Sequence, residues 1–442
     1  MQKRPESGFL RTDSGLFSEA LCLPPNHGEE QRDSGNKPAN LLLPAIGATG
    51  EMHWASGVSE RVDTQTAIKA AAAALVTGQT TPPDLVFLFI SSHHADNYER
   101  VCGWVQEELG DTTLVGCSGS GVIGGGQELE AREAVALIGA WLPDVQVRVG
   151  HVAEFLPATE EEWVEFLEID PQQKSHFLLL ADAVTCDIEV VLRTLDESFP
   201  GMVKLGGLAN AGAPDQPAAL FAHGDLLSGG GLVVALQGAI EVHPVVAQGC
   251  RPVGEPVIVT RARGNVIKEL NAGKPAEVLR RIYDGLNPRD LARFNTSMFL
   301  GVDLGDDSRS RYGRDDFLMR NILGIDPDSG ALAVDAQIQT YQVVQFHMRD
   351  QDTAESQLVE LLRDFVRREP APVVRGALLF SNFGRGERLF GAPNHDSDVF
   401  TRHLGSVPLA GFFCNGEVGP VGERSCLHGY TSVFVLFCEP RA

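Results

Sequence analysis

The chain has 442 residues, 43% of them hydrophobic, and a formal net charge of -23 at pH 7. This length suits more than one domain, and the acidic balance disfavours binding to nucleic acid or to an anionic membrane surface. No apolar run reaches the roughly 18 residues that a bilayer span needs. The amino-terminal segment lacks the apolar core of a secretory signal peptide, so we expect a cytoplasmic protein.

Strand and helix patterns alternate along the first part of the chain. Residues 1–44 are rich in Ser, Gly, Pro, Asn and charged residues and are predicted to form a flexible tail. The periodicity then predicts a strand–helix–strand unit. Its expected elements are a helix at 64–78, a strand at 84–91, a helix at 97–109 and a strand at 112–116.

The same plan is repeated twice further along. The second unit is predicted to have strands at 176–184 and 202–212 around a helix at 186–200, followed by a hairpin of 218–223 with 230–238. The third is predicted to have strands at 373–386, 407–422 and 430–438 and a helix at 398–405.

A different block lies between the second and third units. It is predicted to hold helices at 275–286 and 353–368 and strands at 317–326 and 341–350. The turn before residue 275 indicates a domain boundary, which divides the chain into 45–272 and 273–442. The predicted fold class is α/β, with repeated strand–helix–strand units, mixed sheets and antiparallel hairpins in two associated domains.

Three strand endings resemble one another: LVGCSGSG, LGGLANAG and LAGFFCNGEVG. This similarity indicates a duplicated α/β unit rather than a solenoid, because the spacings are long and unequal. The first ending supports two interpretations. Its glycines could adopt positive φ and let backbone amides converge on an anion such as a carboxylate, with Ser118 and Ser120 as further donors. They could equally form a bulge or tight turn that needs glycine only for geometry.

Charged residues near the later endings support a second hypothesis. Arg385 has the fork geometry for a ligand carboxylate, and Glu417 could receive an ammonium, so together they would suit an amino acid. The alternatives are a surface salt bridge for Arg385 and a simple turn at Asn415 and Glu417. Arg320 and Arg349, on predicted strands, are expected to be paired across a sheet or to point into a cavity.

Neither a metal site nor a cofactor is expected. The eight cysteines are scattered without a C-x-x-C pair. The adjacent His93 and His94 are a weak metal signal and are interpreted as a solvated turn. His428 is interpreted as a structural histidine whose polar atoms are satisfied.

Taken in order, several segments identify a family. The segments LVGCSGSGVIG, KLGGLAN, FLMRNILGID, VQFHMRD, GALLFSNFGRG and GFFCNGEVGPVG make the chain resemble a FIST protein (F-box and intracellular signal transduction) over residues 45–440. The resemblance implies a FIST N half at 45–272 and a FIST C half at 273–442. It also implies a sensory module that binds amino acids or related metabolites. Many relatives carry a cysteine at the position of Asn382, which puts a thiol role there in doubt.

The expected function is therefore that of a non-enzymatic small-ligand sensor acting through a signalling partner in trans. One alternative is a thiol-dependent hydrolase or transferase using Cys117 or Cys414. Another is an interaction scaffold related to the F-box adaptors but lacking the F-box. The predicted ligand-binding residues are Gly116, Cys117, Ser118, Gly119, Ser120, Gly121, Gly206, Gly207, Asn210, Arg320, Ser381, Asn382, Arg385, Asn415, Glu417 and His428.

Overall fold

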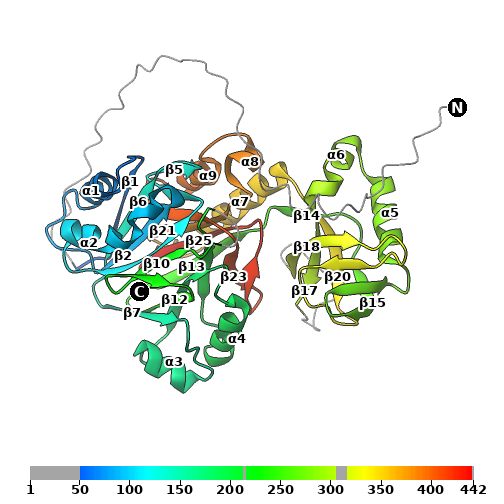
Figure 1. The fold of residues 1–442 in the computed structure, drawn as a ribbon, viewed down its shortest axis with the longest axis horizontal. Coiled ribbons are helices and arrows are strands. Elements are labelled where there is room, and N and C mark those ends of the chain that lie inside the picture. The colour runs from blue at the N-terminus through cyan, green and yellow to red at the C-terminus, as the bar shows by residue number, and fades with distance from the viewer. Residues whose placement is uncertain (1–49, 213–215, 305–315, 441–442) are drawn as a thin grey trace, which may run out of the picture. The chain divides into compact units, whose positions relative to one another are not determined.

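The computed structural model describes residues 50–212, 216–304 and 316–440. Its contacts divide the chain into two compact units (Figure 1). The large unit is formed by the described residues of 50–252, 316–319 and 347–440, and the small unit by those of 253–304 and 320–346. The tail predicted at 1–44 lies outside the described residues.

The large unit contains the predicted α/β plan three times, each copy with its own mixed sheet. The first copy consists of β1 (His53–Ser59), α1 (Thr64–Leu75), β2 (Leu85–Ser91), a 3-10 turn (Ser92–Asn97), α2 (Tyr98–Leu109), β3 (Thr113–Gly119), β4 (Gly121–Gly124), β5 (Gln127–Glu130) and β6 (Val135–Trp141). The second consists of β7 (Val145–Val152), α3 (Glu160–Leu167), β8 (Ser175–Asp182), α4 (Ile188–Ser198), β9 (Lys204–Ala209), β10 (Ala219–Ala222), β11 (Asp225–Ser228) and β12 (Gly231–Gly238). The third consists of β13 (Glu241–Ala247), α7 (Gln351–Val366), β21 (Val374–Asn382), α8 (Gly386–Phe390), α9 (His395–Leu404), β22 (Leu409–Cys414), β23 (Glu417–Val421), β24 (Arg424–His428) and β25 (Ser432–Cys438).

The hairpin of each copy joins the sheet of another copy. The strand orders are β1-β6-β2-β3-β10-β11, β7-β12-β8-β9-β23-β24 and β13-β25-β21-β22-β4-β5. Thus β10 pairs with β3, β23 pairs with β9, and β4 pairs with β22, all antiparallel. In each copy the chain leaves its own sheet after the third strand and enters another sheet as the hairpin. The carboxyl ends of β3, β9 and β22 therefore lie where the three sheets meet.

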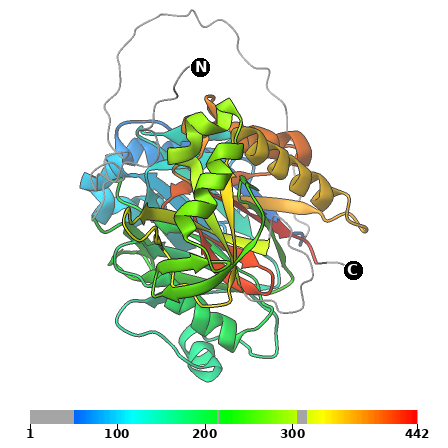
Figure 2. The same ribbon diagram turned by 90° about the vertical axis from the view of Figure 1, so that its right-hand side faces the viewer.

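Each sheet has a helical outer face and an inner face that contributes to one shared core. The shared core holds apolar side chains from all three sheets, among them Phe89, Leu180 and Phe412. Separate apolar clusters join α1 and α2, α3 and α4, and α7 and α9 to the outer faces of their own sheets. Figures 1 and 2 both show these three groups of helices on different sides of the large unit. The continuous apolar strands predicted from the sequence are explained by this burial on both faces.

A glycine at one shared position lets the parallel strands approach each other. It is Gly116 in β3, Gly206 in β9 and Gly411 in β22, and each pairs with a leucine of the preceding parallel strand. A Cβ at any of the three would come within 3.0 Å of that leucine's carbonyl oxygen. The small residues of the similar endings therefore serve close backbone packing in all three copies.

The small unit contains the central β-strands of the block that interrupts the third copy between β13 and α7. These strands form one sheet that closes on itself, because β20 pairs with both β15 and β17. The elements of this block are β14 (Cys250–Pro252), β15 (Val257–Arg263), β16 (Val266–Leu270), α5 (Pro275–Gly285), α6 (Pro288–Ser297), β17 (Met298–Asp303), β18 (Phe317–Ile325), β19 (Leu332–Val334) and β20 (Val343–Arg349). The boundary predicted near residue 273 falls within this block, whereas the compact units divide at 252 and 346. None of the helices in the described ranges is long and apolar enough to cross a membrane.

Two local predictions were wrong. The runs 218–223 and 230–238 do not form a hairpin together, because β10 pairs with β11 and β3, while β12 lies in another sheet between β7 and β8. His94 is not in a solvated turn. It is buried, with its Nδ1 3.0 Å from the Thr64 hydroxyl, because the turn after β2 packs against the start of α1.

Candidate functional site

The ends of β3, β9 and β22 contact one another through polar side chains. The Ser118 hydroxyl donates to the Asn210 carbonyl at 2.9 Å, and the Asn210 amide donates to the Phe413 carbonyl at 2.9 Å. The Ser120 hydroxyl donates to the same Phe413 carbonyl at 3.2 Å. Each copy of the plan is thereby linked to the other two. The predicted residues Ser118, Ser120 and Asn210 thus lie together, beside Phe413, which the sequence analysis did not select.

The glycines of the first ending do not form an amide cradle. Gly116, Gly119 and Gly121 lack positive φ, and the residues around them pair in β3 and β4. A Cβ at Gly119 or Gly121 would lie 3.0 Å from the ring of Phe412 or Phe413, respectively. Cys117 lies in the shared core, and Gly207 also packs against Phe412. The glycines of this stretch therefore serve close packing in β3 and β4 rather than the bulge or tight turn of the alternative, and the expected nest geometry is absent from it.

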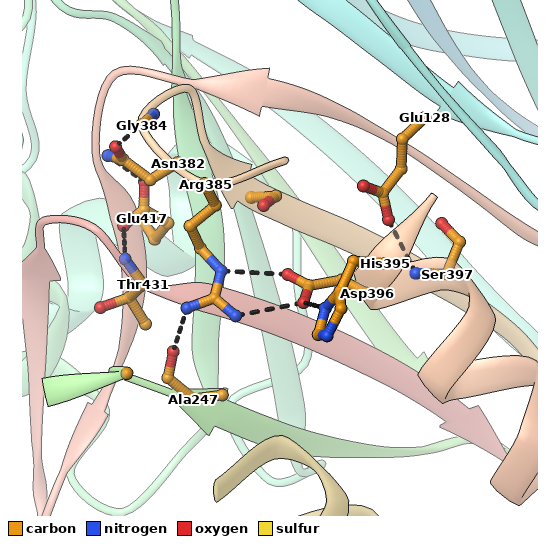
Figure 3. Close-up of polar contacts among 12 residues, drawn as sticks. Glu128, Ala247, Asn382, Gly384, Arg385, His395, Asp396, Ser397, Glu417 and Thr431 are labelled. Carbon is orange, nitrogen blue, oxygen red and sulfur yellow. Dashed lines mark hydrogen bonds and ion pairs between the residues drawn. The ribbon is translucent and has the colours of Figure 1, made fainter. Parts of the chain in front are cut away.

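The strand end of the third copy carries a buried network around a carboxyl group. Asn382, the last residue of β21, donates its amide to Glu417 Oε1 at 2.9 Å and accepts the Gly384 N–H at 2.9 Å (Figure 3). The Thr431 N–H donates to Glu417 Oε2 at 2.9 Å. The Cys414 thiol lies 3.2 Å from Glu417 Oε1. Three separate turns are joined through one side chain.

Glu417 differs electrostatically from the expected counter-charge. It is 0% exposed, and burial raises its pKa to about 8 despite the hydrogen bonds from Asn382 and Thr431. The neutral form therefore predominates near pH 7. Both oxygens of the carboxyl group already accept hydrogen bonds within the protein, from Asn382 and Thr431. It is a hydrogen-bonding group inside the protein.

Arg385 is also committed within the protein. Its Nε and Nη2 donate to the two oxygens of Asp396 at 3.0 and 3.1 Å, and its Nη1 donates to the Ala247 carbonyl at 3.5 Å (Figure 3). The guanidinium is 0% exposed. Burial alone would raise the pKa of Asp396, but Arg385 and His395 outweigh it and hold that pKa below its usual range. The bidentate carboxylate expected from the sequence is thus Asp396 rather than a ligand.

A second buried acid approaches this pair from another copy of the plan. Glu128 on β5 accepts the Ser397 N–H, near the start of α9, at 2.7 Å. Burial, with a smaller contribution from Asp396, raises the pKa of Glu128 to about 8. We define the strand-end cluster as Asn382, Arg385, Asp396, Glu417 and Thr431. Glu128 borders it.

The remaining predicted residues are distributed unevenly. Ser381 precedes Asn382, and its carbonyl accepts the Cys414 thiol. Asn415 is exposed in the turn before β23, as the turn alternative expected. His428 is buried with Nε2 3.1 Å from the Gly419 carbonyl, as a structural histidine would be. Arg320 lies in β18 within the small unit and is not assigned to the cluster.

Sequence reasoning missed Asp396, Thr431 and Glu128. Acidic residues are common in the first turn of a helix. Asp396 lies in the first turn of α9, so its presence in the sequence did not indicate a buried ion pair. Thr431 contributes a backbone N–H, which no residue pattern reveals. Glu128 reaches the third copy because the β4–β5 hairpin joins the sheet of β22. An arginine flanked by glycines was the one available signal, and it identified Arg385.

Comparisons with known proteins agree with the resemblance. The FIST N domain model matches residues 84–273, and the FIST C domain model matches residues 275–420. An uncharacterized protein of Mycobacterium tuberculosis (strain CDC 1551 / Oshkosh) is 34% identical over 386 residues, which cover 87% of this chain and 99% of that protein. An uncharacterized protein of Mycobacterium bovis is 33% identical over 375 residues, 85% of this chain and 96% of its own length. An F-box/LRR-repeat protein of Arabidopsis thaliana is 31% identical over 124 residues, 25% of this chain and 23% of that protein.

Proposed function

Because the chain belongs to the FIST family, whose domains are generally sensory modules of signal transduction, we propose that it is a small-ligand sensor. The proposed ligands are amino acids or related metabolites, and the proposed output is a partner protein acted on in trans. The family assignment supports the sensory role. The site must be argued from the chain's own residues.

The observation that carries the proposal is the strand-end cluster itself. Ligands of α/β sheets tend to lie beyond the carboxyl ends of strands, and the cluster gathers a buried arginine, a buried amide and a raised-pKa acid at such an end. Perturbed ionisable groups of this kind concentrate at functional sites. Close by, Gln248 follows Ala247, and its Oε1 is buried with no hydrogen-bond partner among the described residues. Such an atom suits a ligand donor.

The proposal is tested by a thermal-shift screen of the full chain against amino acids, small carboxylates and nucleotides. A ligand at 100 times its Kd stabilises by about 2.7 kcal/mol, which is a shift of a few degrees in a protein of this size. The shift should be confined to one chemical class and be lost in Asn382→Ala. It should persist in Gln237→Ala, the matched control, because Gln237 is a buried amide with its own hydrogen bonds in the second copy.

Two results would contradict the sensor. One is the absence of any stabilising compound at millimolar concentration. The other is a stable partner captured equally with and without metabolites, which would favour the interaction-scaffold alternative. Ligand-dependent capture of a partner would support the proposed output in trans.

Thiol-dependent catalysis has weaker support. Cys117 and Cys414 are both 0% exposed, and burial raises the pKa of each thiol well above its ordinary value. The reactive thiolate is disfavoured in such surroundings. Slow labelling of both cysteines by iodoacetamide would count against the enzyme, whereas fast labelling of either would revive it.

A further inference from the structure

Arg349 occupies an unusual place beside the strand-end cluster. It is the last residue of β20, opposite Cys250 of β14, and it is partly buried. Its guanidinium carbon lies 4.3 Å from the centre of the Tyr430 ring, and its Nη1 donates to the Gly384 carbonyl at 3.2 Å. Gly384 also donates its N–H to Asn382, so Arg349 is one residue removed from the cluster. Stacking and a single hydrogen bond fix the plane of the guanidinium.

Arg349 forms no ion pair with any carboxylate of the described residues, unlike the arginines around it. Arg385 is paired with Asp396 at 3.0 Å, and Arg251 is paired with Asp350 at 3.5 Å. A buried charge is ordinarily paired, because desolvation is costly. Burial is the largest cause that lowers the pKa of Arg349; Tyr430 and Cys250 oppose this shift, and Arg385 and Arg388 add to it.

The backbone around Arg349 is arranged to keep the stack. A Cβ at Gly384 would lie 2.9 Å from the Tyr430 ring, so only glycine lets that ring approach. Tyr430 has a φ of 60°, a conformation that non-glycine residues seldom adopt. Strained backbone of this kind persists where surrounding structure enforces it, often at ligand-binding sites.

We propose that Arg349 binds the carboxylate of a small anionic ligand. The inference rests on the proposed function and adds the anchor that Arg385, already paired, does not supply. A guanidinium has five N–H groups, and one of those of Arg349 is used by Gly384. The others include the pair that matches the two oxygens of a carboxylate. Phosphate shares this chemistry, but one stacked arginine suits the single charge of a carboxylate better.

The test is calorimetric titration of the full chain with acetate, succinate, L-glutamate and inorganic phosphate at matched ionic strength. At least one carboxylate should bind, and its Kd should rise by about tenfold to a hundredfold in Arg349→Gln. Arg349→Lys should lose most of the affinity as well, because an ammonium keeps the charge but not the fork. The matched control is Arg368→Gln, since Arg368 is an exposed arginine that also stacks on an aromatic ring, that of Phe365, at 4.9 Å.

The outcomes separate this proposal from the sensor. A carboxylate that binds Arg349→Gln as tightly as the unaltered chain overturns the anchor and leaves the sensor standing. The same holds if none of the four anions binds while the thermal-shift screen finds a stabilising ligand of another class. Binding of phosphate alone overturns the carboxylate assignment, and the absence of any ligand in both experiments overturns both proposals. If Arg349→Gln does not fold, Tyr430→Leu tests the same site, and unchanged affinity there would contradict the stacked anchor.

Discussion

The ends of β8 and β21 occupy the same place in two copies of one plan, yet their polar residues have different partners. Asp182, at the end of β8, accepts the N–H groups of Thr185 and Ala218 at 3.2 and 3.0 Å and the Thr185 hydroxyl. These bonds close its own loop and fix the entry to β10. Asn382, at the end of β21, instead donates to Glu417, whose other oxygen accepts from Thr431.

The difference shows which polar groups the third copy has beyond those of the second. In the second copy, the loop after the strand is closed by one carboxylate, that of Asp182, which accepts hydrogen bonds from Thr185 and from the Ala218 N–H. The third copy adds a paired arginine and an acid with a raised pKa, and Arg349, which forms no ion pair among the described residues, lies nearby. Departures from the simplest local solution concentrate at functional sites. The comparison therefore supports the β21 end as the binding site.

The largest expected effect comes from breaking the buried ion pair. Asp396→Ala leaves the Arg385 guanidinium charged and buried, which should lower the free energy of unfolding by about 3–5 kcal/mol. Urea denaturation followed by circular dichroism measures it. In the control Glu60→Ala, the exposed partner Arg132 is released at the surface, and the expected loss is under about 1 kcal/mol. Equal effects of the two changes would mean that Arg385 is not enclosed as described.

The glycine at the shared position of the parallel strands should contribute equally to stability in the second and third copies. Gly206→Ala and Gly411→Ala each force a Cβ against a backbone carbonyl, at an expected cost of about 2–3 kcal/mol. Gly103→Ala is the control, because its Cβ would meet nothing within 4 Å in α2, and it should stabilise by about 0.5–1 kcal/mol. The melting temperatures of the three variants and of the unaltered chain measure these changes in stability. A tolerated alanine in one copy alone would show that the copies are not equivalent there.

Asp182→Ala and Asn382→Ala separate turn closure from binding. The first leaves the N–H groups of Ala218 and Thr185 without their acceptor, which should cost about 2 kcal/mol of stability while ligand affinity is unchanged. The second should reduce ligand affinity as well as stability. Parallel denaturation and ligand titration of both variants provide the measurement. Loss of affinity in Asp182→Ala would remove the distinction between the two strand ends.

The smallest effect is the pH dependence from Glu417. Its pKa is about 8 in the folded protein against an ordinary 4.5, so the folded state holds a proton that the unfolded chain has released between these values. Stability should therefore fall as pH rises towards 8 and level off above it, with about 1 kcal/mol lost between pH 7 and pH 9. Glu417→Gln should flatten this slope, and Glu128, shifted in the same direction, leaves a remainder. An undiminished slope would contradict a neutral Glu417, whereas the exposed Glu60→Gln should leave the slope as it is.

Much of the local structure was readable from the sequence. The apolar runs at 84–91 and 176–184 predicted β2 and β8, because a strand buried on both faces has no polar alternation. The similar endings predicted a unit that recurs three times along the chain, and the large unit contains three copies of it. The hairpin error at 218–238 has a physical cause. Two adjacent apolar strands favour a local hairpin, and nothing in 218–223 records that β10 pairs with β3 of the first copy and with the short β11, while β12 pairs with β7 and β8.

In the candidate site too, local features follow from the sequence and long-range contacts do not. The sequence by itself determined the family, the α/β class, the recurring plan and the importance of the segment around Arg385, because these depend on residue patterns close together along the chain. Only the tertiary structure decided that Asp396 takes the Arg385 fork, that burial raises the pKa of Glu417, and that Arg349 stacks on Tyr430. Pairing and desolvation depend on which distant segments meet in space, and the exchange of hairpins among three sheets sets those meetings.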